Sequence, residues 1–517
     1  MTVRSRGIAF VLTLVLAAVL ALAGCKQEEK KAETSAPQIK VAEAATAPQA
    51  KYVFFFIGDG MGLPQRAATN EYLGRKLVMD EFPAQGITTT HAADRFITGS
   101  AASATALCTG SKTNINYIGV DKDLKPLKTI AEMARDKGMK VGIVSSVSID
   151  HATPAAFYAH VKTRKMYHEI DHALAESGFD FFGGGGFKDP QGKSKLKKDP
   201  EAKVLGDALE KARANGYRYV NNKNDFLALK SGDGKVIAVN EWLQDDEAMP
   251  YVLDMTAKDI TLPEFTGKAI EMLDGDKGFF LMVEGGKIDW ACHANDAAAA
   301  VTNNVSFDDA VKVAMRFAAK HPDETLIVVT GDHECGGLTL GFAGTKYESY
   351  YDVLSGQKVS FQKFTDEIMK DFRTQGGDFE AMKPLITRYF GLKFEGDASS
   401  DRMVLQAHEI AQIQSAFNRS MSGEDKAGGG EYVLYGDYDP LSVTLTHVLN
   451  GKAGLGWTSY QHTGVPVSTS AMGVGAELFN GSYDNTDVAK RIMKSMGLPA
   501  EVQYLGQAAA PAMTAAN

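Results

Sequence analysis

The sequence predicts an α/β fold with a doubly wound, mostly parallel central sheet and helices on both faces. From Lys51 onward, short apolar runs alternate with amphipathic helical patterns, and polar residues follow each run at once. The 517 residues are 44% hydrophobic and 23% charged, which indicates a large globular protein rather than a disordered or fibrous one. The net charge of −9 provides no basic field that would attract nucleic acid.

The N-terminal segment is typical of targeting. Two arginines precede a long apolar run that ends in Leu-Ala-Gly-Cys at Cys25. This resembles a bacterial lipoprotein signal, and it predicts a signal peptide over residues 1–24 with Cys25 as the lipidated N-terminus; an uncleaved anchor helix is the alternative. Lys26, in place of Asp, favours the outer membrane by resemblance to the sorting rule, with the chain facing the periplasm or the exterior. Residues 25–50 lack apolar periodicity and predict a flexible tether.

Four apolar runs are expected to form buried strands of the parallel sheet. They span residues 52–58, 141–149, 279–283 and 325–331. Helical patterns precede the last three runs, at residues 127–138, 262–275 and 307–323. The alternation of strand and helix is the basis of the doubly wound prediction.

Polar side chains follow each predicted strand. They are Asp59, then His151 and Thr153, then Glu284 and Asp289, then Asp332 and His333. Because ligand sites of open α/β sheets form at the carboxyl ends of the strands, these groups are expected to converge on one crevice. Asp and His are common zinc ligands, and Asp, Glu and Thr oxygens suit magnesium. One Asp-His pair would more often be only hydrogen-bonded, but several at successive strand ends favour a metal site.

An Ala-rich run over residues 97–110 has helical propensity and places Ser100 at or near a helix N-terminus. Unpaired N–H groups and the helix dipole favour an anion there. A serine at this position can equally serve as a simple N-cap. Ser103 is a rival on spacing alone, one turn further into the helix.

Six motifs together resemble the alkaline phosphatase family. They are GDGMG (58–62), TGSAASATA (98–106), ATPAAFYAH (152–160), VEGGKIDWACH (283–293), GDHECGG (331–337) and QHTG (461–464). The resemblance implies hydrolysis of phosphate monoesters through a phosphoserine, with two Zn²⁺ and one Mg²⁺ per chain, and little contact with the leaving group. Family members are commonly homodimers.

Carried over residue by residue, the resemblance makes Ser100 the nucleophile and Arg164 the group that holds the phosphate. It implies one zinc site at Asp289, His293 and His462 and a second at Asp332, His333 and Asp59. Asp59 would also bridge to a magnesium held by Glu284 and Thr153.

Three positions depart from the family pattern. Gly99 stands where many relatives have Asp, so a tether for Arg164 is missing and a looser Arg164 is expected. His151 stands where some bacterial members have Asp near the magnesium, and Trp290 where they have Lys. Histidine at the third site could let zinc compete with magnesium there.

Other functions would leave different signatures in the sequence. A superfamily phosphodiesterase would have a Thr nucleophile, a sulfatase a C/S-x-P-x-R motif, and a catalytically silent surface lipoprotein a degraded ligand set; the sequence shows none of these. Residues 168–172, HEIDH, match the H-E-x-x-H zinc protease pattern, but a solvated helix face is the preferred explanation.

The catalytic domain is expected over residues 51–505, followed by a frayed tail at 506–517. An insertion at about 341–457 leaves the alternating pattern and is expected near the active-site rim. Residues 184–254, rich in Lys and Gly, are expected to form a surface extension. Three cysteines remain besides Cys25. Because an odd number cannot all pair within the chain, disulfides are not expected to be the main source of stability.

Overall fold

The computed structural model describes residues 49–200, 203–423 and 431–506, and its centre is a ten-stranded sheet in the order β12-β2-β11-β8-β1-β7-β3-β4-β6-β5. The strands are β1 (Tyr52–Gly58), β2 (Ala84–Thr89), β3 (Lys140–Ser145), β4 (Phe181–Gly184), β5 (Tyr217–Val220), β6 (Lys235–Val239), β7 (Phe279–Glu284), β8 (Thr325–Gly331), β11 (Val467–Gly473) and β12 (Gly481–Asp484). Within this sheet β11 runs antiparallel to β2 and β8, and the other neighbours are parallel. The predicted mostly parallel sheet is confirmed, and its four predicted runs form β1, β3, β7 and β8.

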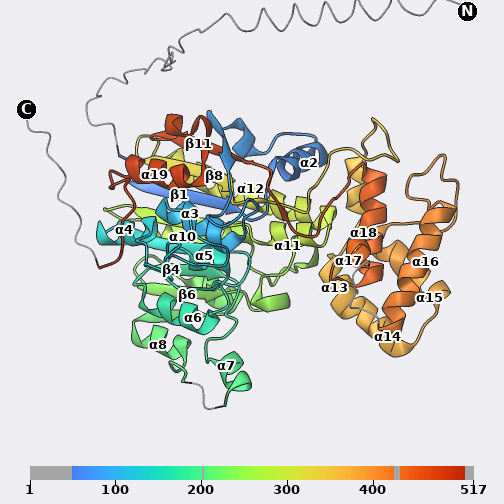
Figure 1. Cartoon of the computed structure of the whole chain (residues 1–517), viewed down its shortest axis with the longest axis horizontal. Helices are drawn as coiled ribbons and strands as arrows, with labels where there is room; N and C mark the ends of the chain where they lie inside the picture. The colour runs from blue at the N-terminus through green and yellow to red at the C-terminus, as the bar shows by residue number, and fades with distance from the viewer. Residues whose placement is uncertain (1–48, 201–202, 424–430, 507–517) are drawn as a thin grey trace, which may run out of the picture. The chain divides into compact units, whose positions relative to one another are not determined.

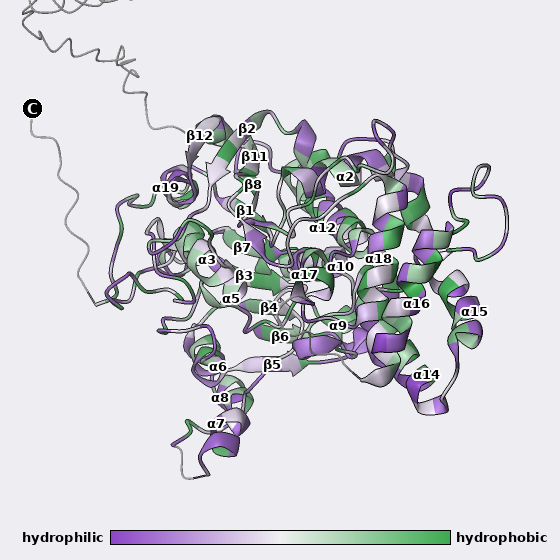
Figure 2. Cartoon of the chain, turned by 45° about the vertical axis from the view of Figure 1, so that its right-hand side comes forward, coloured by the Kyte–Doolittle hydropathy of each residue, from purple (hydrophilic) through white to green (hydrophobic). Residues whose placement is uncertain are grey.

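Strand β1 shows why these runs are continuously apolar. All seven residues are buried, because side chains alternate between two cores on opposite faces of the sheet. Val53 and Phe55 pack into one core, and Phe54 and Phe56 into the other. Figure 2 shows hydrophobic strands at the centre of the molecule.

Helices cover both faces, as predicted. The first core includes residues of α3 (Ser100–Thr109), α4 (Ile130–Asp136), α5 (Ala152–Ala155), α6 (Tyr167–Glu176) and α19 (Asn485–Ser495). The second includes residues of α10 (Leu262–Leu273), α11 (Lys287–His293) and α12 (Ala297–Ala318). Capping boxes start two of the predicted helices, at Thr129 with Glu132 and at Thr261 with Glu264.

The expectation of a surface extension over residues 184–254 is wrong. This segment supplies β5 and β6, which continue the central sheet beyond β4, and residues Val236–Val239 are almost fully buried. It also holds α7 (Lys193–Lys198), α8 (Ala208–Ala214) and α9 (Lys223–Ala228). Its many Lys and Gly residues lie in short helices and turns, and they obscured two strands of only four and five residues.

The segment over residues 341–457 forms a helical layer with a core of its own. Its elements are η4 (Tyr351–Gly356), α13 (Phe361–Lys363), the π-helical η5 (Phe364–Met369), α14 (Lys370–Gln375), α15 (Phe379–Phe390), α16 (Ala407–Ser422), α17 (Tyr432–Tyr435) and α18 (Pro440–Ala453). Figure 1 shows α14, α15, α16 and α18 grouped away from the sheet. Their apolar core also contains Ala68 of α2 (Leu63–Leu73) and residues at the start of α12, so this layer packs directly on the α/β domain.

The predictions for the signal peptide, for Cys25 and for most of the tether lie outside the described residues, as does the tail beyond residue 506. Ala50, the last residue of the predicted tether, already belongs to the fold: its N–H donates to Ser495 O (2.8 Å) and it is buried. Within the described ranges, no helix has both the length and the apolarity needed to cross a bilayer. Cys108, Cys292 and Cys335 are free, buried thiols.

Candidate active site

The polar residues that follow the strands lie together. Asp59 follows β1, Glu284 ends β7, and Asp332 and His333 follow β8; all four are completely buried. The strands are neighbours and parallel, so their carboxyl ends meet at one edge of the sheet. The Nε2 atom of His333 lies 3.3 Å from Asp59 Oδ1 and 3.3 Å from Asp332 Oδ2.

A first potential metal-binding group contains Asp289, His293 and His462, together with the Cys335 thiol. Helix α11 places Asp289 and His293 one turn apart, and His293 Nε2 lies 3.3 Å from Asp289 Oδ2. The Nδ1–H of His293 donates to Tyr460 O (2.6 Å), and that of His462 donates to Thr98 O (2.9 Å).

These two hydrogen bonds determine which ring nitrogen of His293 and His462 carries the proton. With Nδ1 protonated, both Nε2 atoms carry lone pairs, and they lie only 3.1 Å apart beside the Asp289 carboxylate. Two such lone pairs repel unless a proton or a cation lies between them. Donation from the second ring nitrogen to a carbonyl is also the usual arrangement of a metal-binding histidine.

His462 is held in place by a short antiparallel pair. Strand β10 (His462–Thr463) lies against β9 (Glu334–Cys335), with His462 opposite Cys335. The Glu334 carboxylate accepts from Thr463 Oγ1 and from Gln65 Nε2. The Cys335 thiol donates to Asp289 O (3.7 Å), and burial raises its pKa well above the usual value. It is therefore a neutral thiol in the first group.

A second group contains Asp59, Asp332 and His333. The backbone N–H groups of Gly60 and His333 donate to Asp332 Oδ1, at 3.1 and 2.8 Å. Gly60 has φ +69°, and a Cβ there would lie 2.7 Å from Asp289 Cα, so only glycine lets the chain pass between the two groups. The rings of His333 and His462 stack with centroids 3.6 Å apart.

A third group contains Asp59, Glu284 and His151, which makes Asp59 common to two groups. Ser145 Oγ donates to Glu284 Oε2, and Thr153 in α5 is completely buried. The His151 ring stands edge-on to Trp290, with centroids 5.7 Å apart.

Arg164 lies beside this third group. Its Nη2 donates to His151 Nε2 (2.6 Å), and its backbone N–H donates to Asn116 O (2.8 Å). Burial and then the Arg164 guanidinium hold the pKa of His151 well below its usual range. His151 is therefore neutral and holds Arg164 through this hydrogen bond. Gly99 provides no carboxylate that could do so.

Ser100 is the first residue of α3, as the sequence predicted, with Gly99 as its N-cap. It is 1% exposed, and its Oγ lies 3.5 Å from Asp59 Oδ1 and 3.4 Å from His333 Nε2. Ser103, the rival, donates instead to Asp332 O (2.7 Å) and accepts from Asn485 Nδ2. The hydroxyl that faces the second group is thus that of Ser100.

The electrostatics of the site call for cations. Burial and the neighbouring carboxylates Asp332 and Asp289 raise the pKa of Asp59 well above its usual value, and burial raises that of Glu284 to about 7. Burial and then Asp289 raise the pKa of Asp332 to about 8. Several buried oxygen atoms of these residues have no hydrogen-bond partner among the described residues: Asp59 Oδ2, Thr153 Oγ1, Glu284 Oε1, Asp289 Oδ1 and Asp332 Oδ2. Buried polar atoms are rarely left unpaired, so this donor set fits bound metal ions.

One supporting residue was missed by the sequence analysis. Asn295, two residues after His293, has φ +50° and is buried. Its Nδ2 donates to Cys292 O and Ser459 O (both 2.9 Å), and its Oδ1 accepts from His447 Nε2 (3.1 Å). It thereby ties the end of α11 to the segment that leads to His462. A positive φ at an asparagine leaves no periodic pattern in the sequence, so only the fold could reveal this role of Asn295.

The HEIDH segment is not a solvated helix face, contrary to expectation. His168 and His172 of α6 are buried, 1% and 3% exposed. His168 Nδ1–H donates to Asp189 O and its Nε2 accepts from Leu205 N (2.9 Å), while His172 Nε2–H donates to Gly206 O. The loop that follows β4 covers the helix and uses the His168 lone pair, so this segment offers no shared metal site.

Residues 50–498 match the family model described as alkaline phosphatase. The chain belongs to the alkaline phosphatase family. It is 33% identical to alkaline phosphatase 4 of Bacillus subtilis over 458 residues, covering 86% of this chain and 88% of that protein.

Solved structures agree. The cold-active alkaline phosphatase of the psychrophile Shewanella sp. superposes with a TM-score of 0.70 at 29% identity, over 86% of this chain and 99% of that one. The alkaline phosphatase of the Antarctic bacterium TAB5 superposes with a TM-score of 0.60 at 25% identity, over 88% and 99% of the two chains. The chain is therefore an alkaline phosphatase-type enzyme, which hydrolyses phosphate monoesters with the help of metal ions.

Proposed function

We propose that the reaction proceeds through a phosphoserine at Ser100, in a site that holds two zinc ions and one magnesium ion. The first zinc would be held by Asp289, His293 and His462, and the second by Asp59, Asp332 and His333. The magnesium would be held by Asp59, Glu284 and Thr153. The proposal is carried by the two histidine Nε2 atoms that face each other 3.1 Å apart beside Asp289, which only a proton or a cation can reconcile.

The bound cations would supply Lewis-acid stabilisation of charge on the reacting oxygens. The chain itself supplies the nucleophile and its orientation. Ser100 Oγ lies at the N-terminus of α3, where free backbone N–H groups favour the approach of a phosphate. Asp59 Oδ1 lies 3.5 Å and His333 Nε2 3.4 Å from this oxygen, so the hydroxyl faces the second group.

Arg164 would bind two oxygens of the phosphate through its planar guanidinium. His151 holds one edge of that guanidinium and leaves the other N–H groups of Arg164 for substrate. Three divalent cations would carry more positive charge than the four carboxylates carry negative charge, so the pocket suits a dianionic monoester despite the acidic chain.

The third metal site has a histidine at its edge, His151. Two variants of the TAB5 enzyme, with a histidine replaced by glutamate or by aspartate, have Mg bound in the M3 site. We take His151 as the corresponding residue here, because it lies within ligand distance of Asp59 and Glu284. Imidazole suits zinc better than magnesium, so zinc is proposed as the competitor for this site.

The Leu-Ala-Gly-Cys sequence that ends at Cys25 supports a proposed location at the outer membrane. The chain would be anchored through a lipidated Cys25 to the periplasmic or outer face of the outer membrane. Replacement by Cys25→Ala should release the enzyme from the membrane fraction and abolish labelling by a radioactive fatty acid. An unlabelled wild-type chain would refute the anchor.

The phosphoserine is tested with an aryl phosphate. Ser100→Ala should lower kcat by roughly 10³-fold or more, whereas Ser103→Ala, which removes a matched hydroxyl that faces Asp332 O, should keep most of the activity. Acid-quenched wild type should carry one phosphoryl group on the peptide that contains Ser100. Preferred turnover of a diester or a sulfate ester would favour the alternative superfamily activities, and activity that survives Ser100→Ala would refute the mechanism.

A further inference from the structure

A cavity in the described structure lies outside the catalytic groups. It has a volume of about 860 Å³ and is lined by residues from three segments, 339–350, 398–412 and 447–457. None of the residues of the three potential metal-binding groups lines it. A volume of this size suits a small organic ligand.

The charge of the lining is unbalanced. It contains the cations Lys346, Arg402 and Lys452 and a single carboxylate, Glu409. Glu409 is already engaged, because its Oε2 accepts from Lys452 Nζ (2.9 Å) and from the backbone N–H of Gln406 (2.7 Å). Within the part of the chain that is described, neither Lys346 nor Arg402 has a carboxylate at ion-pair distance. Two cations in a protein of net charge −9 thus face the cavity without a counter-ion.

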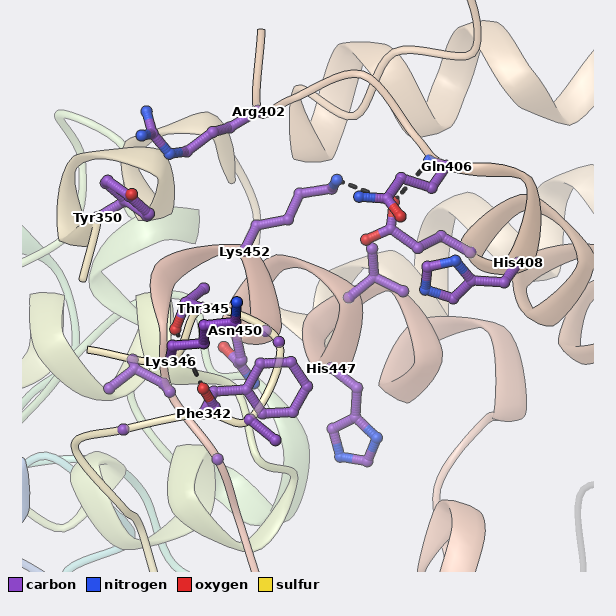
Figure 3. Close-up of a pocket in the computed structure, with 18 of the residues that line it drawn as sticks. Phe342, Thr345, Lys346, Tyr350, Arg402, Gln406, His408, His447, Asn450 and Lys452 are labelled. Atoms are coloured by element: carbon purple, nitrogen blue, oxygen red, sulfur yellow. Dashed lines mark hydrogen bonds and ion pairs between the residues drawn. The ribbon is translucent and has the colours of Figure 1, made fainter. Parts of the chain in front are cut away.

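Arg402 is held ready for an anion. Its guanidinium carbon lies 3.2 Å from the ring centroid of Tyr350, so the ring supports the flat face of the guanidinium and leaves its N–H edges free. Figure 3 shows Arg402 and Tyr350 on one side of the cavity and Gln406 and His408 on the other, with Lys452 extending between them.

The cavity also offers an apolar surface for a ring. Phe342 lines it with 43% of its surface exposed, so part of its ring is accessible to a ligand. Val404 and Leu455, both buried, form part of the same lining. A ligand that joins a flat apolar group to an anionic head would satisfy both parts of the lining.

We propose that this cavity is a second, non-catalytic binding site for a small aromatic anion with a phosphate-like head. Arg402 and Lys346 hold the head, and Phe342 contacts the ring. The site does not depend on the phosphoserine mechanism, since it shares no residue with the candidate active site.

The test is isothermal titration calorimetry of the metal-loaded protein with two probes. Phenylphosphonate has the head and the ring, methylphosphonate has only the head, and neither contains an ester bond that the enzyme could hydrolyse. The active site is expected to accept the head of both probes. Phenylphosphonate should therefore bind with one more equivalent per chain than methylphosphonate. If the candidate active site does not bind a phosphate-like head at all, both probes lose one equivalent and this difference stays intact.

Two variants locate the extra equivalent. Arg402→Ala and Lys346→Ala should each weaken it at least tenfold, and Lys346 lies on an exposed loop where a substitution is not expected to affect folding. The matched control is Arg388→Ala, because Arg388 also stacks on a tyrosine, Tyr389, with a centroid distance of 5.3 Å, but does not line the cavity. Equal stoichiometry for the two probes, or an extra equivalent unchanged in both cavity variants, would overturn the proposal.

Discussion

Removal of the metal ions should make the stability of this protein fall as the pH rises. Without cations, the buried carboxyl groups of Glu284 and Asp332 have raised pKa values, about 7 and about 8. An acid with a raised pKa holds its proton in the folded state where the unfolded chain has released it. The folded state then binds more protons, so the free energy of unfolding decreases with pH between the unfolded and the folded pKa.

The magnitude follows from Glu284. Its pKa rises from 4.5 to about 7, which at about 1.4 kcal/mol per pKa unit destabilises the metal-free fold by on the order of 3 kcal/mol at pH 8. Asp332 acts in the same direction between 3.8 and about 8. His293 does so as well: although burial lowers its pKa, Asp289 raises it to about 9, so its contribution is complete below 6.5 and lost above 9. Bound cations remove all three effects, because they favour ionised carboxylates and neutral imidazole.

The assay is thermal unfolding of the zinc- and magnesium-loaded protein and of the chelator-treated protein between pH 6 and pH 9. The difference between the two Tm values should widen steadily with pH. Glu284→Gln keeps the shape of the side chain but cannot ionise, so the chelator-treated variant should lose less stability over this range than the wild type does. A Tm difference that stays constant or narrows above pH 7 would refute the reasoning.

Three further changes have defined outcomes. Gly99→Asp would place a carboxylate before the nucleophile and give Arg164 an ionic partner, an interaction worth about 1.5 kcal/mol. The inhibition constant of the product, phosphate, should then fall roughly tenfold. An unchanged inhibition constant would show that His151 already fixes the arginine. Asn295→Gly keeps the positive φ but removes the hydrogen bonds to His447 and to the two carbonyls. The zinc affinity measured by chelator competition should therefore fall about 10- to 100-fold. An unchanged zinc affinity would show that Asn295 only fills space. His151→Asp should raise the magnesium content measured after dialysis, and a fall in magnesium would exclude this residue from the third site.

The sequence was sufficient where the chemistry lies at strand ends. Long buried strands such as β1 and β8 have unmistakable apolar runs, so the residues that follow them, Asp59 and Asp332, could be placed at one edge of the sheet from the amino-acid pattern alone. Ser100 could be placed at a helix start because alanine-rich sequence follows a glycine. These are local patterns. In a parallel sheet the residues that follow neighbouring strands lie at the same edge, so the local patterns also predict which residues lie close together.

The remaining features depend on contacts that sequence periodicity does not encode. Strand β5 has only four residues and its pairing with β6 decides its place, so a Lys- and Gly-rich region was mistaken for surface. His172 was assigned to a solvated helix face, yet a later loop covers it. Asn295 and the cavity beside Arg402 arise from packing between distant segments, which one sequence without its fold does not show.

The most direct measurement of the central claim is anomalous X-ray diffraction at the zinc absorption edge from crystals of the metal-loaded protein. We expect one strong peak between Asp289, His293 and His462, and a second between Asp59, Asp332 and His333, on the side of the Ser100 hydroxyl. Crystals of active enzyme with no anomalous peak at either place, or with zinc bound only elsewhere, would contradict the account.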